Sequence, residues 1–397
     1  MDKRNMIDKR VYCKHEGQGV YAEYFQEVSK KQCEEYCGQL EKDGFVLHEE
    51  HWLGENTFYT YVKEKDINFV SYYPNVQEMH VVSEPNSNWL QYSDEAGEDK
   101  VSTLLRQVDL EDFGESYVLR LRDGRMIVFD GGFEKESDAE ALMNTLKEFS
   151  NDEKPRVAAW IMTHPHSDHY RCFLIVEEKY GDAIEIEKFI YNFPDTGESE
   201  WEAMPGLTLY EEIPYLEKMY QAVERTGAKV YRAHTGQVYQ VGNAKMEILS
   251  SPDNTLLQPV KDFNQVSLVI RMEIEGQVII WGGDSCFEYA KLGERYGTYL
   301  KADIFQIPHH GFPGGEVKAY DFISPDVCFI CGLDWVWLGT KFKFYELEYN
   351  QHLIYNMDIK EYLMGGHGDI TLQLPYFPRK NGKVELIQRI AKLREVK

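Results

Sequence analysis

The pattern of apolar and polar residues changes character at about residue 100. Before that point, an apolar stripe with helical spacing follows Ser29, and Gln32 three residues later completes a capping-box signature. Gly44 is a helix-stop signal, and four strand-like runs separated by polar turns come after it. We therefore expect a small α+β domain within residues 1–100, ending in a turn-rich linker over 84–100. The four expected strands are Phe45–His51, Thr57–Val62, Ile67–Tyr73 and Glu78–Val82.

Beyond residue 100, apolar runs of strand length alternate with amphipathic helical stretches, a pattern typical of an α/β domain of layered sheets covered by helices. We expect this domain to span residues 101–378. A C-terminal helix over 379–397, with an apolar stripe at Val384, Ile387, Ile390 and Ala391, should pack on it. The expected strands are Tyr117–Leu121, Met126–Phe129, Val157–Thr163, Lys245–Leu249, Val266–Ile274, Gln277–Trp281, Ile304–Ile307 and Val327–Cys331, and the expected helices are Ala139–Phe149 and Leu216–Arg225.

Charge and composition narrow the function classes. The chain carries 43 Lys and Arg against 67 Asp and Glu, a formal net charge of −24. Long nucleic acid is a polyanion that proteins hold with basic residues, so this charge argues against it and favours a small-molecule substrate. No apolar run approaches the 18 or so residues of a membrane span, and no signal-peptide pattern follows Met1. We predict a cytoplasmic protein without a membrane segment, and a homodimer is left open.

The seven cysteines form no disulfide framework. Cys328 and Cys331 have the spacing of a zinc-binding pair, but they belong to an expected strand. Residues three apart in a strand point to opposite faces, so a zinc ion shared by these two thiols is not expected.

The segment after the expected strand Val157–Thr163 is rich in potential metal ligands. It places His164, His166, Asp168 and His169 within six residues at the carboxyl end of a buried strand. Imidazole and carboxylate groups suit zinc, iron or manganese, and two pairs of ligands from one short loop could hold two ions. This loop is the strongest functional signal in the sequence.

Three further motifs stand at expected strand ends. Asp284 follows Trp281-Gly282-Gly283, where the glycines allow a close approach of the backbone and the carboxylate could bridge two cations. His309 and His310, in Pro308-His309-His310-Gly311, could ligate a metal or contact an oxyanion. Asp130, in Phe129-Asp130-Gly131-Gly132, could accept a hydrogen bond from the second ring nitrogen of a ligand histidine.

Together and in this order, the four motifs resemble the metallo-β-lactamase superfamily over residues 101–378. The His-His-Gly string is more similar to the branch of phosphorylcholine esterases and the nuclease-like domain of DNA-uptake proteins than to the β-lactamases. The resemblance implies an αββα sandwich with two divalent metal ions at one edge, zinc being expected and manganese or iron left open.

Carried over by position, the resemblance implies one metal site at His164, His166 and Asp284. Many relatives supply a third histidine before the bridging aspartate, but this chain has Asp262-Phe263-Asn264-Gln265 at that place. We therefore expect this site to be the weaker one, with Asn264 or water in place of the histidine.

The second implied site consists of Asp168, His169 and Asp284, and we expect it to be the better formed. Its last ligand is usually a histidine near the end of the domain. His352 is our candidate, with His310 as its rival and His367 as a weaker third.

These residues predict a hydrolase whose nucleophile is a metal-bound hydroxide, since the sequence has no Gly-x-Ser-x-Gly motif and no paired Cys–His signature. We expect Asp168 to orient the water, and His309 or His310 to stabilise the oxyanion or protonate the leaving oxygen. A small phosphodiester or phosphorylated metabolite is the expected substrate. A lactone or thioester hydrolase and a non-catalytic metal-binding regulatory protein are the alternatives.

Overall fold

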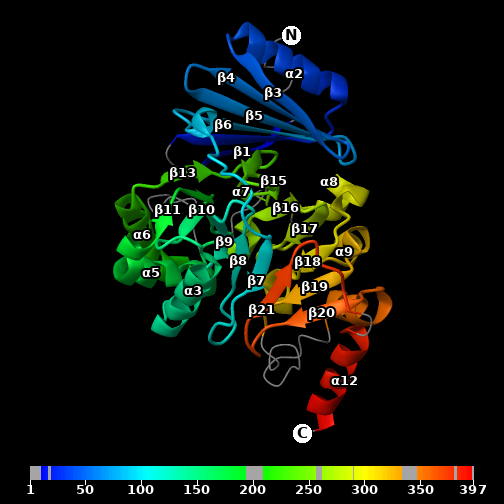
Figure 1. Cartoon of the computed structure of the whole chain (residues 1–397). Helices are drawn as coiled ribbons and strands as arrows, with labels where there is room; N and C mark the ends of the chain where they lie inside the picture. The colour runs from blue at the N-terminus through cyan, green and yellow to red at the C-terminus, as the bar shows by residue number, and fades with distance from the viewer. Residues whose placement is uncertain are drawn as a thin grey trace.

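The computed structural model describes residues 10–16, 19–193, 209–255, 262–288, 290–332, 347–379 and 382–395. Within these residues the chain forms three sheets, one near the N-terminus and two that pack face to face. Figure 1 shows the first sheet at one end of the molecule and helix α12 (Gly382–Glu395) at the other.

The N-terminal sheet is antiparallel throughout, with the strand order β1-β2-β6-β5-β4-β3. Helix α2 (Lys30–Lys42) covers one of its faces and buries Cys33, Cys37 and Leu40. The capping box expected at Ser29 and Gln32 is present. The strands are β1 (Arg10–Glu16), β2 (Val20–Phe25), β3 (Val46–Leu53), β4 (Asn56–Lys63), β5 (Asp66–Tyr73) and β6 (Glu78–Glu84).

The second sheet has eight strands in the order β13-β12-β10-β9-β8-β7-β21, with β11 paired to β10. Strands β9, β10, β12 and β13 are parallel to one another, and β8, β7 and β21 extend the sheet in antiparallel fashion. The strands are β7 (Leu104–Gln107), β8 (Ser116–Arg120), β9 (Met126–Asp130), β10 (Arg156–Ile161), β11 (Glu185–Ile186), β12 (Lys188–Tyr191), β13 (Lys229–Arg232) and β21 (Ile370–Gln373).

The third sheet has seven strands in the order β14-β15-β16-β17-β18-β19-β20. The run from β17 to β20 is parallel, and the other pairs are antiparallel. The strands are β14 (Val238–Val241), β15 (Ala244–Ser250), β16 (Val269–Ile274), β17 (Gln277–Trp281), β18 (Ile304–Gln306), β19 (Val327–Ile330) and β20 (Glu361–Met364).

The second and third sheets form the centre of an αββα sandwich, as the sequence predicts. Their facing sides bury one apolar cluster, in which the ring of Trp281 stacks on Phe129 at 4.3 Å between centroids. One further apolar cluster lies between each of these two sheets and the helices outside it. The outer helices are α3 (Glu136–Phe149), α5 (Cys172–Tyr180) and α6 (Leu209–Thr226) on one side, and α8 (Leu292–Tyr296), α9 (Val317–Ile323) and α11 (Glu348–Gln351) on the other.

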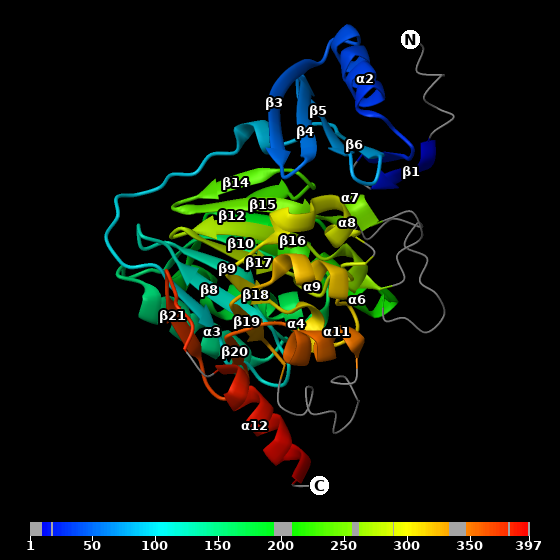
Figure 2. The same cartoon turned by 90° about the vertical axis from the view of Figure 1, so that its right-hand side faces the viewer.

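The N-terminal sheet sits against one end of this sandwich (Figure 2). His51 of β3 contacts the carbonyl of Gly236, and Glu78 of β6 forms ion pairs with Lys291 and Arg295. The segment 84–100, which was predicted as a linker, is held to the sandwich at Asp94, whose carboxylate pairs with Arg125 and with Lys188. None of the helices within the described residues has the length and apolar character needed to cross a bilayer.

Four parallel strands end at one edge of the sandwich, two from each sheet. They are β9 and β10 in the second sheet and β17 and β18 in the third. The polar motifs of the sequence follow these four strands directly, so the fold itself brings them to a common place.

Candidate metal centre

The loop after β10 is organised by one buried carboxylate, that of Asp130 at the end of β9. Its Oδ1 accepts a hydrogen bond from the backbone N–H of Thr163 at 2.7 Å, and its Oδ2 accepts one from the Thr163 hydroxyl at 2.8 Å. Oδ2 also accepts from Nδ1 of His169 at 2.8 Å, as the sequence predicts. With Nδ1 held in this hydrogen bond, Nε2 of His169 faces the interior of the site, where it can offer a lone pair to a cation once its own proton leaves.

The turn that carries Asp284 approaches this loop closely. Gly283 adopts a left-handed backbone with φ of 50°, and a Cβ placed on it would lie 3.0 Å from the Cβ of Thr163. A Cβ on Gly282 would lie 2.9 Å from Cγ of Pro308. The two glycines therefore let strand β17 deliver its carboxylate between the loops that follow β10 and β18.

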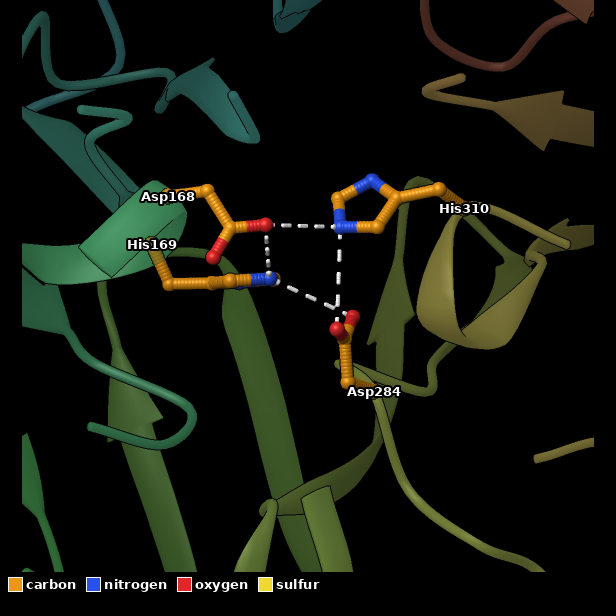
Figure 3. Close-up of side chains that lie close together, drawn as sticks. All are labelled: Asp168, His169, Asp284 and His310. Carbon is orange, nitrogen blue, oxygen red and sulfur yellow. Dashed lines mark hydrogen bonds and ion pairs between the residues drawn. The ribbon is translucent and has the colours of Figure 1, made fainter. Parts of the chain in front are cut away.

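The tightest group of potential ligands consists of Asp168, His169, Asp284 and His310, all buried (Figure 3). Nε2 of His310 lies 3.1 Å from Oδ2 of Asp168 and 3.6 Å from Oδ2 of Asp284. Nε2 of His169 lies 3.3 Å from Oδ1 of Asp284 and 3.7 Å from Oδ2 of Asp168. Two imidazoles and two carboxylates thus converge on one point, two of them from each sheet.

A second group of ligands, His164, His166 and Asp284, shares its carboxylate with the first. Nε2 of His164 lies 3.7 Å from Oδ2 of Asp284 and 3.0 Å from Nδ1 of His166. His166 is partly exposed, and its Nε2 lies 3.5 Å from the carboxylate of Asp262. Asp284 is therefore placed to bridge two cations.

The described residues fit divalent cations. Nε2 of His169 and Oδ1 of Asp284 are buried and have no hydrogen-bond partner among the described residues. Polar atoms buried in this way are costly unless an ion or water satisfies them. Imidazole nitrogen with carboxylate oxygen is a donor set for zinc, iron or manganese.

The pKa shifts of the buried histidines and carboxylates also indicate a place for a divalent cation. Burial lowers the pKa of His169, but the carboxylates of Asp284, Asp168 and Asp130 raise it more, so that it ends well above its ordinary value. Burial raises the pKa of Asp284, but His169 and His310 pull it well below the ordinary value. The protons on the two imidazoles balance the carboxylates, which is the role that a divalent cation would take over.

His309 lies beside these groups and is partly exposed. Its Nδ1 donates a hydrogen bond to the carbonyl of Pro313 at 2.6 Å, and its Nε2 accepts one from Nδ2 of Asn264 at 3.1 Å. Nε2 is 3.9 Å from Oδ2 of Asp284. Asn264, which the sequence analysis considered as a substitute ligand, thus contacts His309.

His352 belongs to neither group of ligands. The sequence analysis preferred it to His310 as the last ligand, and the structure disagrees with that choice. Its Nε2 hydrogen-bonds to Asp321 of helix α9 at 2.6 Å. The physical reason is its position after α11, in the outer helical layer, whereas the ligand groups lie at the strand ends. His367 is exposed on the surface. His310 occupies the place that the sequence analysis gave first to His352.

Replacing His310 with alanine should therefore remove one of two bound metal ions, because it deletes a nitrogen from the four-residue group. Replacing His352 with alanine should leave the metal content unchanged. Elemental analysis of both variants after dialysis against buffered zinc measures this difference. Equal loss of metal from both, or loss only from the His352 variant, would restore His352 as the ligand.

The sequence analysis did not place two buried residues near His310. Glu115 precedes β8, Cys331 follows β19, and with His310 they form a further group of potential ligand atoms. Glu115 belongs to no recognisable motif, the C-x-x-C spacing of Cys331 pointed to Cys328 instead, and the packing of the two sheets brings Glu115 and Cys331 together. Cys328, three residues earlier, packs in the apolar cluster on the outer side of the third sheet.

Comparison with known proteins agrees with part of this description. Residues 110–281 match the sequence model of the metallo-beta-lactamase superfamily, a segment that includes the loop His164–His169 and ends just before Asp284. No curated protein matches the chain.

Among solved structures, 38 chains match. One is CmlA, a diiron beta-hydroxylase from Streptomyces venezuelae, with 12% identity and a TM-score of 0.41; the match covers 74% of this chain and 55% of that one. The chain thus spans about half the length of CmlA. The metallo-beta-lactamase fold protein YhfI from Bacillus subtilis has 9% identity and a TM-score of 0.40, with 68% and 99% covered. Unliganded yeast PDE1 has 12% identity and a TM-score of 0.38, with 69% and 100% covered.

Proposed function

We propose that this chain is a hydrolase that uses two divalent metal ions, zinc being the first candidate, to cleave a small phosphodiester or a related phosphorylated metabolite. The observation that supports the proposal most is the pair of ligand groups that share Asp284 at the edge of the sandwich. Asp168, His169, Asp284 and His310 would hold one ion, and His164, His166 and Asp284 the other. Divalent cations bound there would act as Lewis acids and lower the pKa of water towards about 7.

Asp168 is suited to orient the attacking water. Its side chain is 11% exposed, against 2% for that of Asp284, so it is the more accessible of the two carboxylates. Its backbone carbonyl accepts a hydrogen bond from the backbone N–H of Glu115 at 3.0 Å, which holds its place in the site. Asp168 can therefore accept a hydrogen bond from water and take its proton while it keeps a fixed orientation.

His309 is suited to move a proton at the leaving oxygen. Burial lowers the pKa of His309, so the ring is neutral near pH 7, with its proton on Nδ1 towards Pro313. Nε2, which accepts a hydrogen bond from Asn264, would take up a proton from solvent and pass it to the leaving oxygen. The His309 side chain is 21% exposed, so solvent and substrate can reach it.

The charge of the site admits an anionic group at the cleaved bond once cations are bound. Asp168 and Asp284 belong to the ligand groups and Asp130 lies behind His169, so bound cations would have to offset these carboxylates before an anion could be held there. The net charge of −24 disfavours a long polyanion. A small phosphorylated molecule satisfies both conditions.

The direct test is to measure metal content and to assay the metal-loaded protein on bis(4-nitrophenyl) phosphate. We expect about two ions per chain and measurable turnover. Asp168→Asn should reduce turnover by on the order of a hundredfold or more, because a positioned acid–base group contributes about that much. Lys318→Gln, an exposed change on α9, is the control and should be silent. Protein that binds no metal, or metal-loaded protein inert on phosphodiesters, would contradict the proposal, and cleavage of lactones or thioesters alone would replace its substrate class.

A further inference from the structure

The backbone that presents His310 is held in an unfavourable conformation. His309 (φ 54°, ψ 41°), His310 (φ 53°, ψ 11°) and Gly311 (φ 90°) are three consecutive left-handed residues. Residues with a Cβ rarely adopt this conformation, so surrounding contacts must maintain it. Backbone anchors exist on both sides: the N–H of His309 donates to the carbonyl of Gly283, and Asn350 donates to the carbonyl of Gly311. They fix the backbone, but they leave the orientation of the His310 ring open.

The ring of His310 faces two different groups through its two nitrogens. Nε2 points to Asp168 and Asp284, whereas Nδ1 points away from them (Figure 3). Nδ1 lies 3.1 Å from Sγ of Cys331 and 3.8 Å from Oε2 of Glu115. All three side chains are buried, so water does not compete for this second face of the ring.

Glu115 is itself held firmly and contacts both parts of the site. Its backbone N–H donates to the carbonyl of Asp168 at 3.0 Å, and its Oε2 accepts a hydrogen bond from Nε2 of Gln306 at 3.2 Å. Sγ of Cys331 lies 3.7 Å from the carbonyl of Gly114, which gives the thiol hydrogen an acceptor of its own. Sulfur can therefore receive the proton of His310 while its own proton points elsewhere.

The tautomer of His310 decides whether the ring can ligate a metal. A nitrogen that binds a cation must present a lone pair, so ligation through Nε2 requires the proton to sit on Nδ1. A proton on Nδ1 needs an acceptor when the ring is buried, and the acceptors within reach among the described residues are Cys331 and Glu115. Acceptors at the second nitrogen of a ligand histidine commonly hold its orientation and raise its basicity.

We propose that Cys331 and Glu115 are positioning residues that keep the proton of His310 on Nδ1 and turn its Nε2 towards the metal centre. This inference rests on the proposed function, since it assigns the two residues a role in metal binding. Cys331 supplies the near contact at 3.1 Å, and Oε2 of Glu115 lies behind it at 3.8 Å from Nδ1. The pair takes the place that an aspartate takes for His169, where Asp130 accepts directly from Nδ1.

Zinc affinity, measured by competition with a chromophoric chelator, tests the proposal. Cys331→Ala should lower the affinity for one of the two zinc ions by about 10- to 100-fold, the usual effect of removing a partner of a ligand histidine. Cys331→Ser should restore part of the loss, because a hydroxyl can still accept from Nδ1. Glu115→Gln should also lower the affinity for this ion. The amide must turn its oxygen to Gln306, and its NH2 then faces the proton of His310, which needs an acceptor. Cys328→Ala, a buried thiol of the same strand with no contact to the site, is the matched control and should keep full affinity.

Two spectroscopic readouts on wild-type protein keep the test decisive if a variant fails to fold. Nitrogen-15 spectra of zinc-loaded, histidine-labelled protein should show His310 protonated at Nδ1. The cobalt-loaded protein should lack an intense near-ultraviolet sulfur-to-cobalt band, since Cys331 supports a ligand and is not one. A protonated Nε2, a sulfur-to-cobalt band, or unchanged zinc affinity in Cys331→Ala and Glu115→Gln would overturn this inference while leaving the proposed function standing. Absence of zinc binding by the wild type would instead overturn the proposed function itself.

Discussion

Replacing Asp284 with alanine should remove both metal ions and lower hydrolysis by on the order of a thousandfold, the upper end of what loss of one electrostatic group usually costs. Asp284 is the residue shared by the two ligand groups, with Oδ1 3.3 Å from His169, and Oδ2 3.7 Å from His164 and 3.6 Å from His310. No other carboxylate among the described residues belongs to both groups. Its loss should therefore act on both ions together, unlike the loss of His310.

Elemental analysis and the phosphodiesterase assay on the same preparation measure this effect. Asp284→Asn, which keeps the shape of the side chain, separates the charge from the packing, and its melting temperature with chelator present reports whether the fold survives. Asp321→Asn removes an exposed carboxylate that pairs with His352 in the outer layer, away from the ligand groups, so it should leave metal and turnover unchanged. Retention of either metal by a folded Asp284→Ala variant would show that the carboxylate does not bridge.

Replacing His234 with alanine should lower the free energy of unfolding by about 3–5 kcal/mol, the cost of leaving a buried charge without its partner. His234 is fully buried where the end of β13 meets strand β6 of the N-terminal sheet. Its Nδ1 lies 2.9 Å from Asp253, and its Nε2 lies 3.4 Å from Glu84. Without the imidazole, the two carboxylates would lose their shared positive charge and keep neutral donors, among them Ser251 for Asp253 and Ser87 for Glu84. Urea denaturation at pH 7 measures the loss, and His48→Ala, an exposed histidine of β3, is the control.

The same residue predicts a dependence on pH. Burial lowers the pKa of His234, but Asp253 and then Glu84 raise it more, to about 10. The unfolded value is about 6.5, so the folded state binds the proton more tightly. The contribution to stability is then complete below about pH 6.5 and is lost as the pH rises through about 10. The difference in the free energy of unfolding between wild type and His234→Ala should therefore shrink as the pH rises. A constant difference from pH 6 to 10.5 would contradict the charged state of His234.

Sequence reasoning succeeded where a buried strand is followed directly by polar residues. An apolar run fixes both the strand and its end, and parallel strands end at one edge, so the loops after β9, β10, β17 and β18 could be expected to meet. The role of Asp130 as the acceptor for His169 followed from the same logic. The ligands His164 to His169 are local in sequence, which is why the spacing alone was informative.

Sequence reasoning failed where contacts join distant segments or where elements are short. Strands β12, β13, β14, β20 and β21 have four residues each, too few for an alternating pattern to rise above chance, although β18 and β19, which are no longer, were predicted from their apolar runs. In helix α12, Leu386 and Ile390 are buried while Val384 and Ile387 are exposed, so Ile390 of the expected stripe packs in the core and the first two positions do not. The choice between His310 and His352 depended on which layer each occupies, and sequence separation says nothing about layers.

The division of the ligands between the two sheets has a consequence for how the protein folds. Asp168 and His169 come from the second sheet, Asp284 and His310 from the third, and more than a hundred residues separate the two pairs along the chain. Contacts between such distant segments form late, because the entropy of closing the intervening loop must be overcome first. A half-assembled chain with one sheet formed has only half of the coordination sphere. The rate at which a chromophoric metal ion is bound during refolding would then report the rate at which the two sheets dock.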